Sequence, residues 1–140
     1  MPAHDPALSA LAEATYVSLR TFRRDGSSAD TPVWVARLDG SLVLFTDGTS
    51  WKVKRVRANP HCAVAICNAA GTVSGEWVPG SAHVVVEPER ERRAFETLRA
   101  KYGLRMRVLD LVSWIGGRIG RLVVLEVVLS GKNTASLITT

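Results

Sequence analysis

The dipeptide Asp39-Gly40 lies between two strand-like stretches, and this arrangement constrains the fold more than any other feature of the sequence. Residues 31–38 before it and residues 41–46 after it are rich in valine, leucine, threonine and aromatic side chains, which are common in strands. An Asp-Gly pair is a strong signal for a two-residue hairpin turn. The two stretches are therefore predicted to pair as antiparallel neighbours.

The rest of the chain alternates short apolar strands with helical segments. Four further strands are predicted, at residues 16–22, 62–68, 72–86 and 122–129. The third of these is interrupted by Gly75 and by Pro79-Gly80, where a bulge or bend is expected. Helices are predicted at residues 7–14, 51–59, 88–102 and 104–115. Six strands with few helices predict a mainly β fold, a six-stranded antiparallel barrel.

Length and composition favour one ordinary domain. The 140 residues are 46% hydrophobic and 22% charged, as in soluble globular proteins. No linker divides residues 1–140, of which 1–14 are expected to form an N-terminal helix or arm and 130–140 a loose polar tail. No apolar run is long enough for a membrane helix, and the N-terminus lacks the basic and apolar regions of a signal peptide. A cytoplasmic protein without a membrane partner is expected.

No motif for acid–base, nucleophilic or metal catalysis is present in the sequence. Cys62 and Cys67 are five residues apart, so on one strand they would point to opposite faces and could not form a disulfide. Neither cysteine has the ligand spacing of a metal site, and both are expected to be buried and reduced. The sequence therefore nominates no catalytic side chain and no metal ligand.

Positive charge is concentrated in the short helix predicted after the hairpin. The net charge is +5, and four basic side chains without an acid among them fall within six positions: Lys52, Lys54, Arg55 and Arg57. Ser50 precedes the helix as an N-cap candidate, and a helix N-terminus offers free N–H groups and the positive end of the helix dipole. Together these groups form a suitable cradle for a phosphate. A capped, solvated basic helix without a ligand fits the same spacing equally well.

The residues around this helix resemble those of the split-barrel flavin-binding family typified by pyridoxamine 5′-phosphate oxidase. The shared pattern is Ser50-x-Lys52 at the start of a short helix that ends in Asn59-Pro60. The wider order of segments, YVSLRTFRRDG, TPVWVARLDG and GTVSGEWVPGSAHVV, is similar to the actinobacterial branch of the family that is predicted to use coenzyme F420, a deazaflavin. The resemblance covers residues 16–86 well and the rest of the chain more loosely.

This resemblance implies a split β-barrel with short flanking helices, assembled as a homodimer with the cofactor at the subunit interface. The side chains implied to hold the cofactor phosphate and acidic tail are Ser50, Lys52, Lys54 and Arg55. The residues implied to lie along the ring system are Thr31, Pro32, Val33 and Trp34, with Thr46 at the end of the strand beside them. The residues implied for a second wall, from this subunit or the other, and for an apolar slot over the ring are Gly75, Trp77 and Trp51.

Two departures from the family pattern favour the deazaflavin over FMN. The flavin oxidases of vitamin metabolism carry an arginine where this sequence has Pro32, and an Arg-x-His where this sequence has residues 118–121 without histidine. The long anionic oligoglutamate tail of coenzyme F420 also suits an unusually basic loop. The resemblance therefore implies an F420-dependent oxidoreductase that transfers a hydride between the deazaflavin and a small organic substrate, whose identity the sequence does not reveal.

Three other functions stay open at this level. The chain could be an FMN-binding split-barrel protein, or it could bind its cofactor without turnover, as a sequestering or regulatory module. A basic barrel with aromatic side chains could also bind nucleic acid. Such a barrel would interleave basic and aromatic residues along its strands, whereas these strands are mostly aliphatic, so no nucleic-acid partner is expected.

Overall fold

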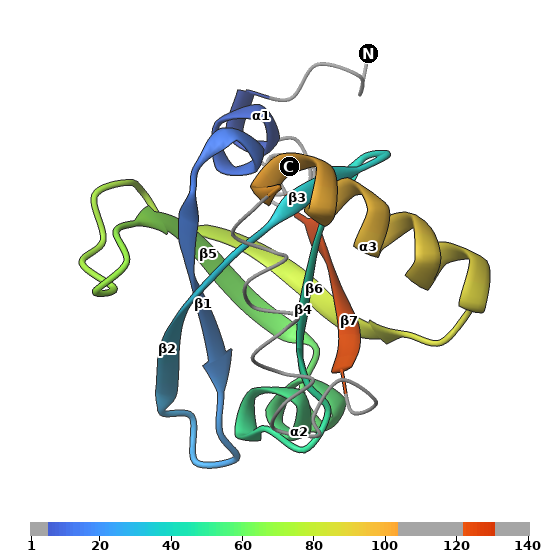
Figure 1. Ribbon diagram of the computed structural model, residues 1–140. Coiled ribbons are helices and arrows are strands. Elements are labelled where there is room, and N and C mark those ends of the chain that lie inside the picture. Colours follow the sequence, from blue (N-terminus) through green and yellow to red (C-terminus); the bar gives the residue numbers. More distant parts are fainter. Residues whose placement is uncertain (1–5, 104–121, 131–140) are drawn as a thin grey trace, which may run out of the picture.

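Seven strands form a single antiparallel sheet in the computed structural model, which describes residues 6–103 and 122–130 (Figure 1). In chain order the strands are β1 (Tyr16–Phe22), β2 (Ser28–Val33), β3 (Ala36–Leu38), β4 (Ser41–Asp47), β5 (His61–Cys67), β6 (Val78–Val85) and β7 (Leu122–Leu129). The helices of the described residues are α1 (Pro6–Glu13), α2 (Trp51–Ala58) and α3 (Pro88–Tyr102). Across the sheet, the strands lie in the order β2-β1-β5-β6-β7-β4-β3.

The sheet curls, because β2 and β3 follow each other in the chain but lie at its two opposite edges. Only Trp34 and Val35 separate these two strands, so the edges approach each other and the sheet forms a half-barrel. At one end of the half-barrel, α2 lies beside the tip of the β1–β2 hairpin, whereas α1 and α3 lie toward the other end (Figure 1). β7 lies between β6 and β4 and joins the two parts of the sheet.

The prediction of six strands is wrong, because the segment 31–38 is not one continuous strand. It is divided at Val35, whose N–H donates to the Tyr102 hydroxyl at 2.9 Å and whose carbonyl accepts from the Lys101 ammonium at 2.6 Å. These bonds from the last turn of α3 take the place of strand pairing, so the chain leaves the β1 edge and pairs with β4 from Ala36 onward. The mainly β, split-barrel class is confirmed, with seven strands instead of six.

Most of the predicted element boundaries are confirmed. β1, β7 and α3 have the predicted ends, and β3 and β4 form the predicted hairpin, with Asp39 at a φ of 55°. The strand predicted over 72–86 begins only at Val78, after a bend at Gly75, so its predicted start is wrong. β6 keeps an unbroken register with β5 through Pro79 and Gly80, so the interruption expected there is also wrong. The helix predicted over 104–115 lies outside the described residues. Among the helices of the described part, none is long and apolar enough to cross a membrane.

Side chains on the two faces of the sheet form two hydrophobic clusters. α1 and α2 pack on one face, where Val53 and Val56 of α2 are fully enclosed among strand residues. α3 packs on the other face, where Leu98 contacts the second cluster. The neighbouring β7 residues Val124 and Leu125 enter different clusters, so β7 is buried on both faces, as its continuous apolar sequence predicts.

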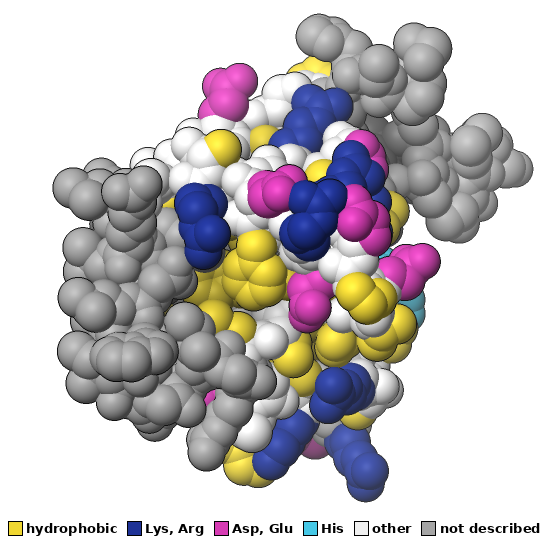
Figure 2. All heavy atoms as spheres, turned by 45° about the vertical axis from the view of Figure 1, so that its right-hand side comes forward, with side chains coloured by type: hydrophobic (Ala, Val, Ile, Leu, Met, Phe, Trp, Pro, Cys, Tyr) yellow, Lys and Arg dark blue, Asp and Glu magenta, His cyan; other side chains and the backbone are white. Residues whose placement is uncertain are grey.

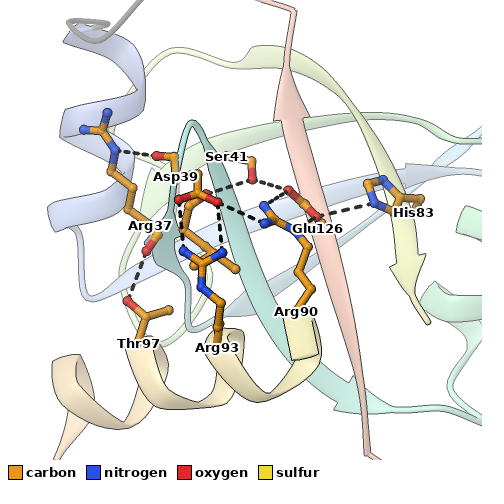
Figure 3. A network of polar contacts seen from close by, with 9 residues as sticks. Arg37, Asp39, Ser41, His83, Arg90, Arg93, Thr97 and Glu126 are labelled. Atoms are coloured by element: carbon orange, nitrogen blue, oxygen red, sulfur yellow. Dashed lines mark hydrogen bonds and ion pairs between the residues drawn. The ribbon is translucent and has the colours of Figure 1, made fainter. Parts of the chain in front are cut away.

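A polar network ties α3 to its face of the sheet (Figure 3). The Glu126 carboxylate on β7, whose side chain is 8% exposed, accepts bonds from Arg90 Nε at 2.8 Å and Arg90 Nη2 at 2.6 Å, and from the Ser41 hydroxyl. Arg90 Nη1 also donates to Asp39 in the β3–β4 turn at 3.0 Å. The exposed ring of His83 lies 3.5 Å from the same carboxylate. The Arg90 guanidinium is the main cause that holds the pKa of Glu126 below its usual value.

Candidate functional site

The chain enters α2 through a tight turn that follows β4. The Asp47 carboxylate accepts bonds from the N–H and the hydroxyl of Thr49, at 2.8 and 2.7 Å, and the N–H of Ser50 donates to the Asp47 carbonyl at 3.0 Å. Aspartate commonly stabilises turns in this way. Val53 and Val56 then anchor the helix in the core, so the N-terminus of α2 is held in place against the sheet.

Ser50 occupies the N-cap position of α2, but its hydroxyl does not form the side-chain cap bond that was expected. The Oγ atom is shielded from solvent and has no hydrogen-bond partner in the part of the chain that the structure describes. A buried hydroxyl without a partner is costly and uncommon in folded proteins. Because a helix N-terminus favours negative charge, and no acidic side chain lies in the first turn of α2, this hydroxyl is placed to donate to an anion.

Lys52 and Thr46 lie on either side of this turn in the chain. Lys52 is half-buried, and burial lowers the pKa of its ammonium; the charge of Arg55 lowers that pKa further, whereas Asp47 raises it. An anion bound nearby would stabilise the charged form of Lys52. The side chain of Thr46 is buried at the end of β4. Both positions are compatible with a phosphate at the N-terminus of α2, and direct contact with one stays a prediction.

A pocket of about 620 Å³ opens between α2 and the tip of the β1–β2 hairpin. The residues that line it are Phe22, Arg23, Arg24, Trp51, Lys54, Arg55 and Ala58. Four of these side chains are basic and none is acidic. Basic side chains also gather at the lower end of the molecule in Figure 2, the end at which Figure 1 shows α2.

Three of the predicted cofactor ligands lie in this pocket. Arg55 Nε donates to the hydroxyl of Thr21 on β1 at 2.7 Å, which holds the guanidinium against the hairpin. Lys54 Nζ lies 4.5 Å from the centre of the Trp51 ring, a favourable cation–π distance. The Trp51 side chain is 70% exposed, which is unusual for the largest apolar side chain. The structure therefore brings Trp51, Lys54 and Arg55 together on one face of α2.

Arg23 and Arg24 complete the pocket, and the sequence analysis did not single them out. They lie in the β1–β2 turn. β1 is long enough for this turn to lie beside α2. Arg23 Nη1 donates to Ser27 Oγ at 3.1 Å and to the Ser28 carbonyl at 2.9 Å. The sequence signal that could have identified these residues is the pair of consecutive arginines directly before Asp25-Gly26. Asp25-Gly26 predicts a turn here, but the strand after it was predicted to begin at residue 31 rather than 28, so the two arginines were not placed at the tip of a tight hairpin.

The residues predicted along the cofactor ring are divided between the two faces of the sheet. Thr31 and Val33 pair with residues of β1 that face α2, so they share that face. Pro32 is exposed on the opposite face. Trp34 stacks on Tyr102, with 4.5 Å between the ring centroids, and packs in the cluster beneath α3. In this chain, Trp34 is thus placed with α3 and not with α2.

Gly75 and Trp77 lie in the segment that leads into β6. The N–H of Gly75 donates to the Ile66 carbonyl at 3.3 Å. The Trp77 ring lies 3.8 Å from the guanidinium of Arg20, which is also paired with Asp30 at 2.8 Å. Trp77 therefore packs against β1 and β2 on the face away from α2. Their role as a second wall of a cofactor site stays a prediction.

Comparison with known families shows what kind of protein carries this site. The family model described as pyridoxamine 5′-phosphate oxidase matches residues 4–128. The chain belongs to this family. The match includes α2, the β1–β2 hairpin and β7, so the whole half-barrel of this pyridoxamine 5′-phosphate oxidase family member is covered. No curated protein matches the chain significantly.

The descriptions of solved structures with the same fold name different cofactors. An F420 reductase has a TM-score of 0.57 and 16% identity, over 90% of this chain and 95% of the other. A FAD-binding protein from Mesorhizobium loti has a TM-score of 0.59 and 17% identity, over 88% and 84%. HutZ, a heme storage protein from Vibrio cholerae, has a TM-score of 0.64 and 10% identity, over 92% and 96%. At sequence identities this low, the structural similarity shows the shared fold alone.

Proposed function

We propose that this family member is an oxidoreductase that binds a flavin-type cofactor with its phosphate at the N-terminus of α2, and that coenzyme F420 is the preferred cofactor. The observation that carries the proposal is the buried hydroxyl of Ser50 at this N-terminus, which has no hydrogen-bond partner among the described residues. A phosphate would accept a bond from Ser50 and from free N–H groups of the helix, and its charge would be balanced by Lys52. The F420 reductase and the FAD-binding protein of the same fold support a cofactor of this type.

In this proposal, the residues of the chain bind the cofactor and orient its ring. A flavin-type cofactor supplies the hydride chemistry when it is bound, so no acid–base pair of the protein is required. Ser50 and Lys52 hold the phosphate, and Lys54 and Arg55 balance more distant negative charge. β2 and the end of β4 provide a wall along which a planar ring can lie, which fixes its orientation and excludes water from one side. The substrate is a small organic molecule that lies against the ring.

Lys52→Ala is expected to weaken cofactor binding by about 1.5–3 kcal/mol, the usual contribution of a charged hydrogen bond. The reason is the position of Lys52 in the first turn of α2, two residues after the unpartnered Ser50. Isothermal titration calorimetry at moderate salt measures the change. The matched control is Arg57→Ala, which removes the same charge from an exposed position of the same helix that does not line the pocket. Equal affinities of wild type and Lys52→Ala, with the fold intact, would refute this placement.

The deazaflavin is expected to bind more tightly than FMN, and its affinity is expected to rise with tail length and fall with salt. A compact phosphate can use one or two of the basic side chains of α2, whereas an oligoglutamate tail can reach several, each with a modest, screened contribution. Titration of both cofactors at low and high ionic strength measures these dependences. Tighter binding of FMN, or a deazaflavin affinity indifferent to tail and salt, would show that the cofactor is assigned wrongly.

We further propose that the active form is a homodimer with the cofactor at the interface. One half-barrel covers a cofactor of this size poorly, and Trp77 lies on the face away from α2, where it could serve as a wall for the site of a neighbouring subunit. Native mass spectrometry of protein incubated with FMN and with coenzyme F420 is expected to show two chains with bound deazaflavin. A monomer at micromolar concentration in light scattering would contradict the dimer.

A protein that binds its cofactor without turnover is the second candidate. HutZ, with the same fold, is described as a storage protein, which supports a binding role for a chain of this architecture. Both candidates share the phosphate site at α2 and differ in whether bound, reduced cofactor passes a hydride to an added acceptor. Loss of the reduced-cofactor absorbance on addition of small organic acceptors supports the oxidoreductase, and a stable reduced complex with every acceptor supports the binding protein.

The two thiols support a reducing compartment for this oxidoreductase. Cys62 and Cys67 are both free and buried, and burial raises the pKa of Cys62 to about 11, so its thiol is unreactive at neutral pH. Proteins of oxidising compartments more often pair their cysteines. We therefore place the protein in the cytoplasm.

A further inference from the structure

The pocket between α2 and the β1–β2 hairpin carries more positive charge than a single phosphate requires. Ser50 and Lys52, to which the proposed function assigns the phosphate, are not among the residues that line it. Its basic side chains come from two elements: Arg23 and Arg24 from the hairpin, and Lys54 and Arg55 from α2. The pocket is therefore a neighbouring site with its own set of charges.

Among the described residues, these four cations have no ion-pair partner. Within residues 6–103 and 122–130, none of them forms a salt bridge. Burial lowers the pKa of Arg55, and the charge of Arg23 lowers it further, so these two guanidinium groups repel each other. Asp25 also interacts electrostatically with Arg23, but its carboxylate accepts bonds from the N–H and the hydroxyl of Ser27, at 2.9 and 2.6 Å. Repulsion of this kind is relieved when an anion binds between the cations.

The facing arginines are held in position before any ligand binds. On the hairpin, Arg23 Nη1 is bonded to Ser27 Oγ and to the Ser28 carbonyl. On α2, Arg55 Nε is bonded to Thr21 Oγ1. A guanidinium has five N–H donors, so both groups keep donors for a ligand while their positions are fixed. Such preorganisation lowers the entropic cost of binding.

We propose that this pocket is a second anion-binding site, for a group with at least two negative charges, and that Arg23 and Arg24 recognise this group together with Lys54 and Arg55. The proposal rests on the proposed function in one respect, because the group is taken to be the part of the cofactor that extends beyond the phosphate at Ser50. An oligocarboxylate chain meets this requirement, whereas FAD adds a single negative charge beyond the phosphate at Ser50, on the second phosphate of its diphosphate, and FMN adds none. The β1–β2 hairpin then determines selection for extended cofactors over FMN.

The geometry of the pocket favours a ligand that carries several negative charges. Each cation is partly exposed, so its contact with a single negative charge is screened and weak. A ligand that spans the gap between Arg23 on the hairpin and Arg55 on α2 engages both elements at once, and the later contacts form at a high effective concentration. A monoanion such as acetate gains only one of these contacts.

The first experiment uses anionic probes that contain no flavin ring. Inorganic pyrophosphate, a triglutamate peptide and acetate are titrated into the full chain by calorimetry at low ionic strength. Triglutamate, which represents an oligocarboxylate extension, or pyrophosphate, which is a compact polyanion, is expected to bind, and acetate is not. The double variant Arg23→Ala/Arg24→Ala is expected to weaken the better probe by about tenfold or more, and Arg57→Ala by less than about twofold. No binding of either polyanion, or equal binding by the double variant, would overturn the inference.

The second experiment separates this inference from the proposed function. FMN, FAD and coenzyme F420 are titrated into wild type, into Arg23→Ala/Arg24→Ala and into Ser50→Ala. The hairpin variant is expected to keep the FMN affinity of wild type and to lose affinity for coenzyme F420, which carries the oligocarboxylate extension. Ser50→Ala is expected to weaken all cofactors that bind. A protein that binds pyrophosphate or triglutamate through the hairpin but binds no cofactor would refute the proposed function alone; an unchanged preference for extended cofactors in the hairpin variant would refute the inference alone.

Discussion

Replacing Arg90 with methionine is expected to lower the free energy of unfolding by about 3–4 kcal/mol, as measured by denaturant unfolding. Arg90 makes two bonds to the Glu126 carboxylate, at 2.8 and 2.6 Å, and that side chain is only 8% exposed. Removal of the guanidinium leaves a buried negative charge on β7 whose closest remaining contacts are Ser41 and the His83 ring. Breaking one side of a buried ion pair costs more than the pair contributes, because the other charge stays desolvated.

The matched control is Arg92→Met on the same helix. Arg92 pairs with Glu89 and Glu96, and all three side chains are more than half exposed. Exposed pairs of this kind contribute little, so a loss below about 1 kcal/mol is expected. If the two variants lost the same stability, the Glu126 contact would not have the importance that its burial indicates.

The pH dependence of the two proteins gives a second check. In the native protein, the folded-state pKa of Glu126 is lowered, chiefly by its bonds from Arg90. Its contribution to stability is therefore complete above the unfolded-state pKa and is lost as the pH falls through the folded-state pKa. Without Arg90, burial would instead raise the pKa of Glu126, so protonation would relieve the penalty. The stability deficit of Arg90→Met is expected to shrink on acidification, and a deficit constant with pH would contradict this account.

Lys101→Met is expected to cost about 3–4 kcal/mol in unfolding free energy, since three charge-assisted bonds are lost together. Lys101 Nζ lies 2.6 Å from each of the carbonyls of Ala12, Ala14 and Val35. Burial lowers the pKa of Lys101 to about 8, so the amine stays mainly protonated at neutral pH and offers all three hydrogens. Methionine fills a similar volume but removes the ammonium from three carbonyls, of which Val35 keeps a bond from the Tyr102 hydroxyl at 2.9 Å. Loss of far-ultraviolet ellipticity in urea titrations measures the effect.

Lys54→Met is the control for this change. Lys54 is an exposed lysine in a helix of the same protein, and its contact with the ring of Trp51 is on the surface. A change within about 1 kcal/mol is expected for it. Equal losses for Lys54→Met and Lys101→Met would mean that the three carbonyl contacts do not hold α1, α3 and the β2–β3 junction together.

Local patterns predicted most of the elements, and distant contacts determined the rest. β1, β7 and α3 have the predicted ends because their apolar patterns are local to each segment, and because α3 begins at Pro88 and is followed by Gly103. The division of residues 31–38 into β2 and β3 depends on Lys101 and Tyr102, which lie more than sixty residues away in the chain. The apolar sequence TPVWVARL contains no sign of this division.

The residues of the candidate site also divide into those that local sequence predicts and those whose place depends on distant contacts. The turn before α2 and the basic face of this helix could be predicted, because Ser50 and the lysines lie within one short segment. Arg23 and Arg24 could not, since their contact with α2 depends on the pairing of β1 with β2 and on the curl of the sheet. Trp34 is the opposite case: the family resemblance implied a place along the cofactor, whereas in the structure its ring stacks on Tyr102 of α3.

Among the described strands β7 is the last in sequence, and yet it lies inside the sheet, between β6 and β4. Until residues 122–129 have been synthesised, the unit β2-β1-β5-β6 and the hairpin β3–β4 share no backbone pairing. Pairs such as Leu42 with Val127 close a very long loop, which makes their formation slow. The sheet is therefore completed only after β7 has been synthesised, and a chain cut short before β7 would expose the unpaired edges of β6 and β4 to other nascent chains.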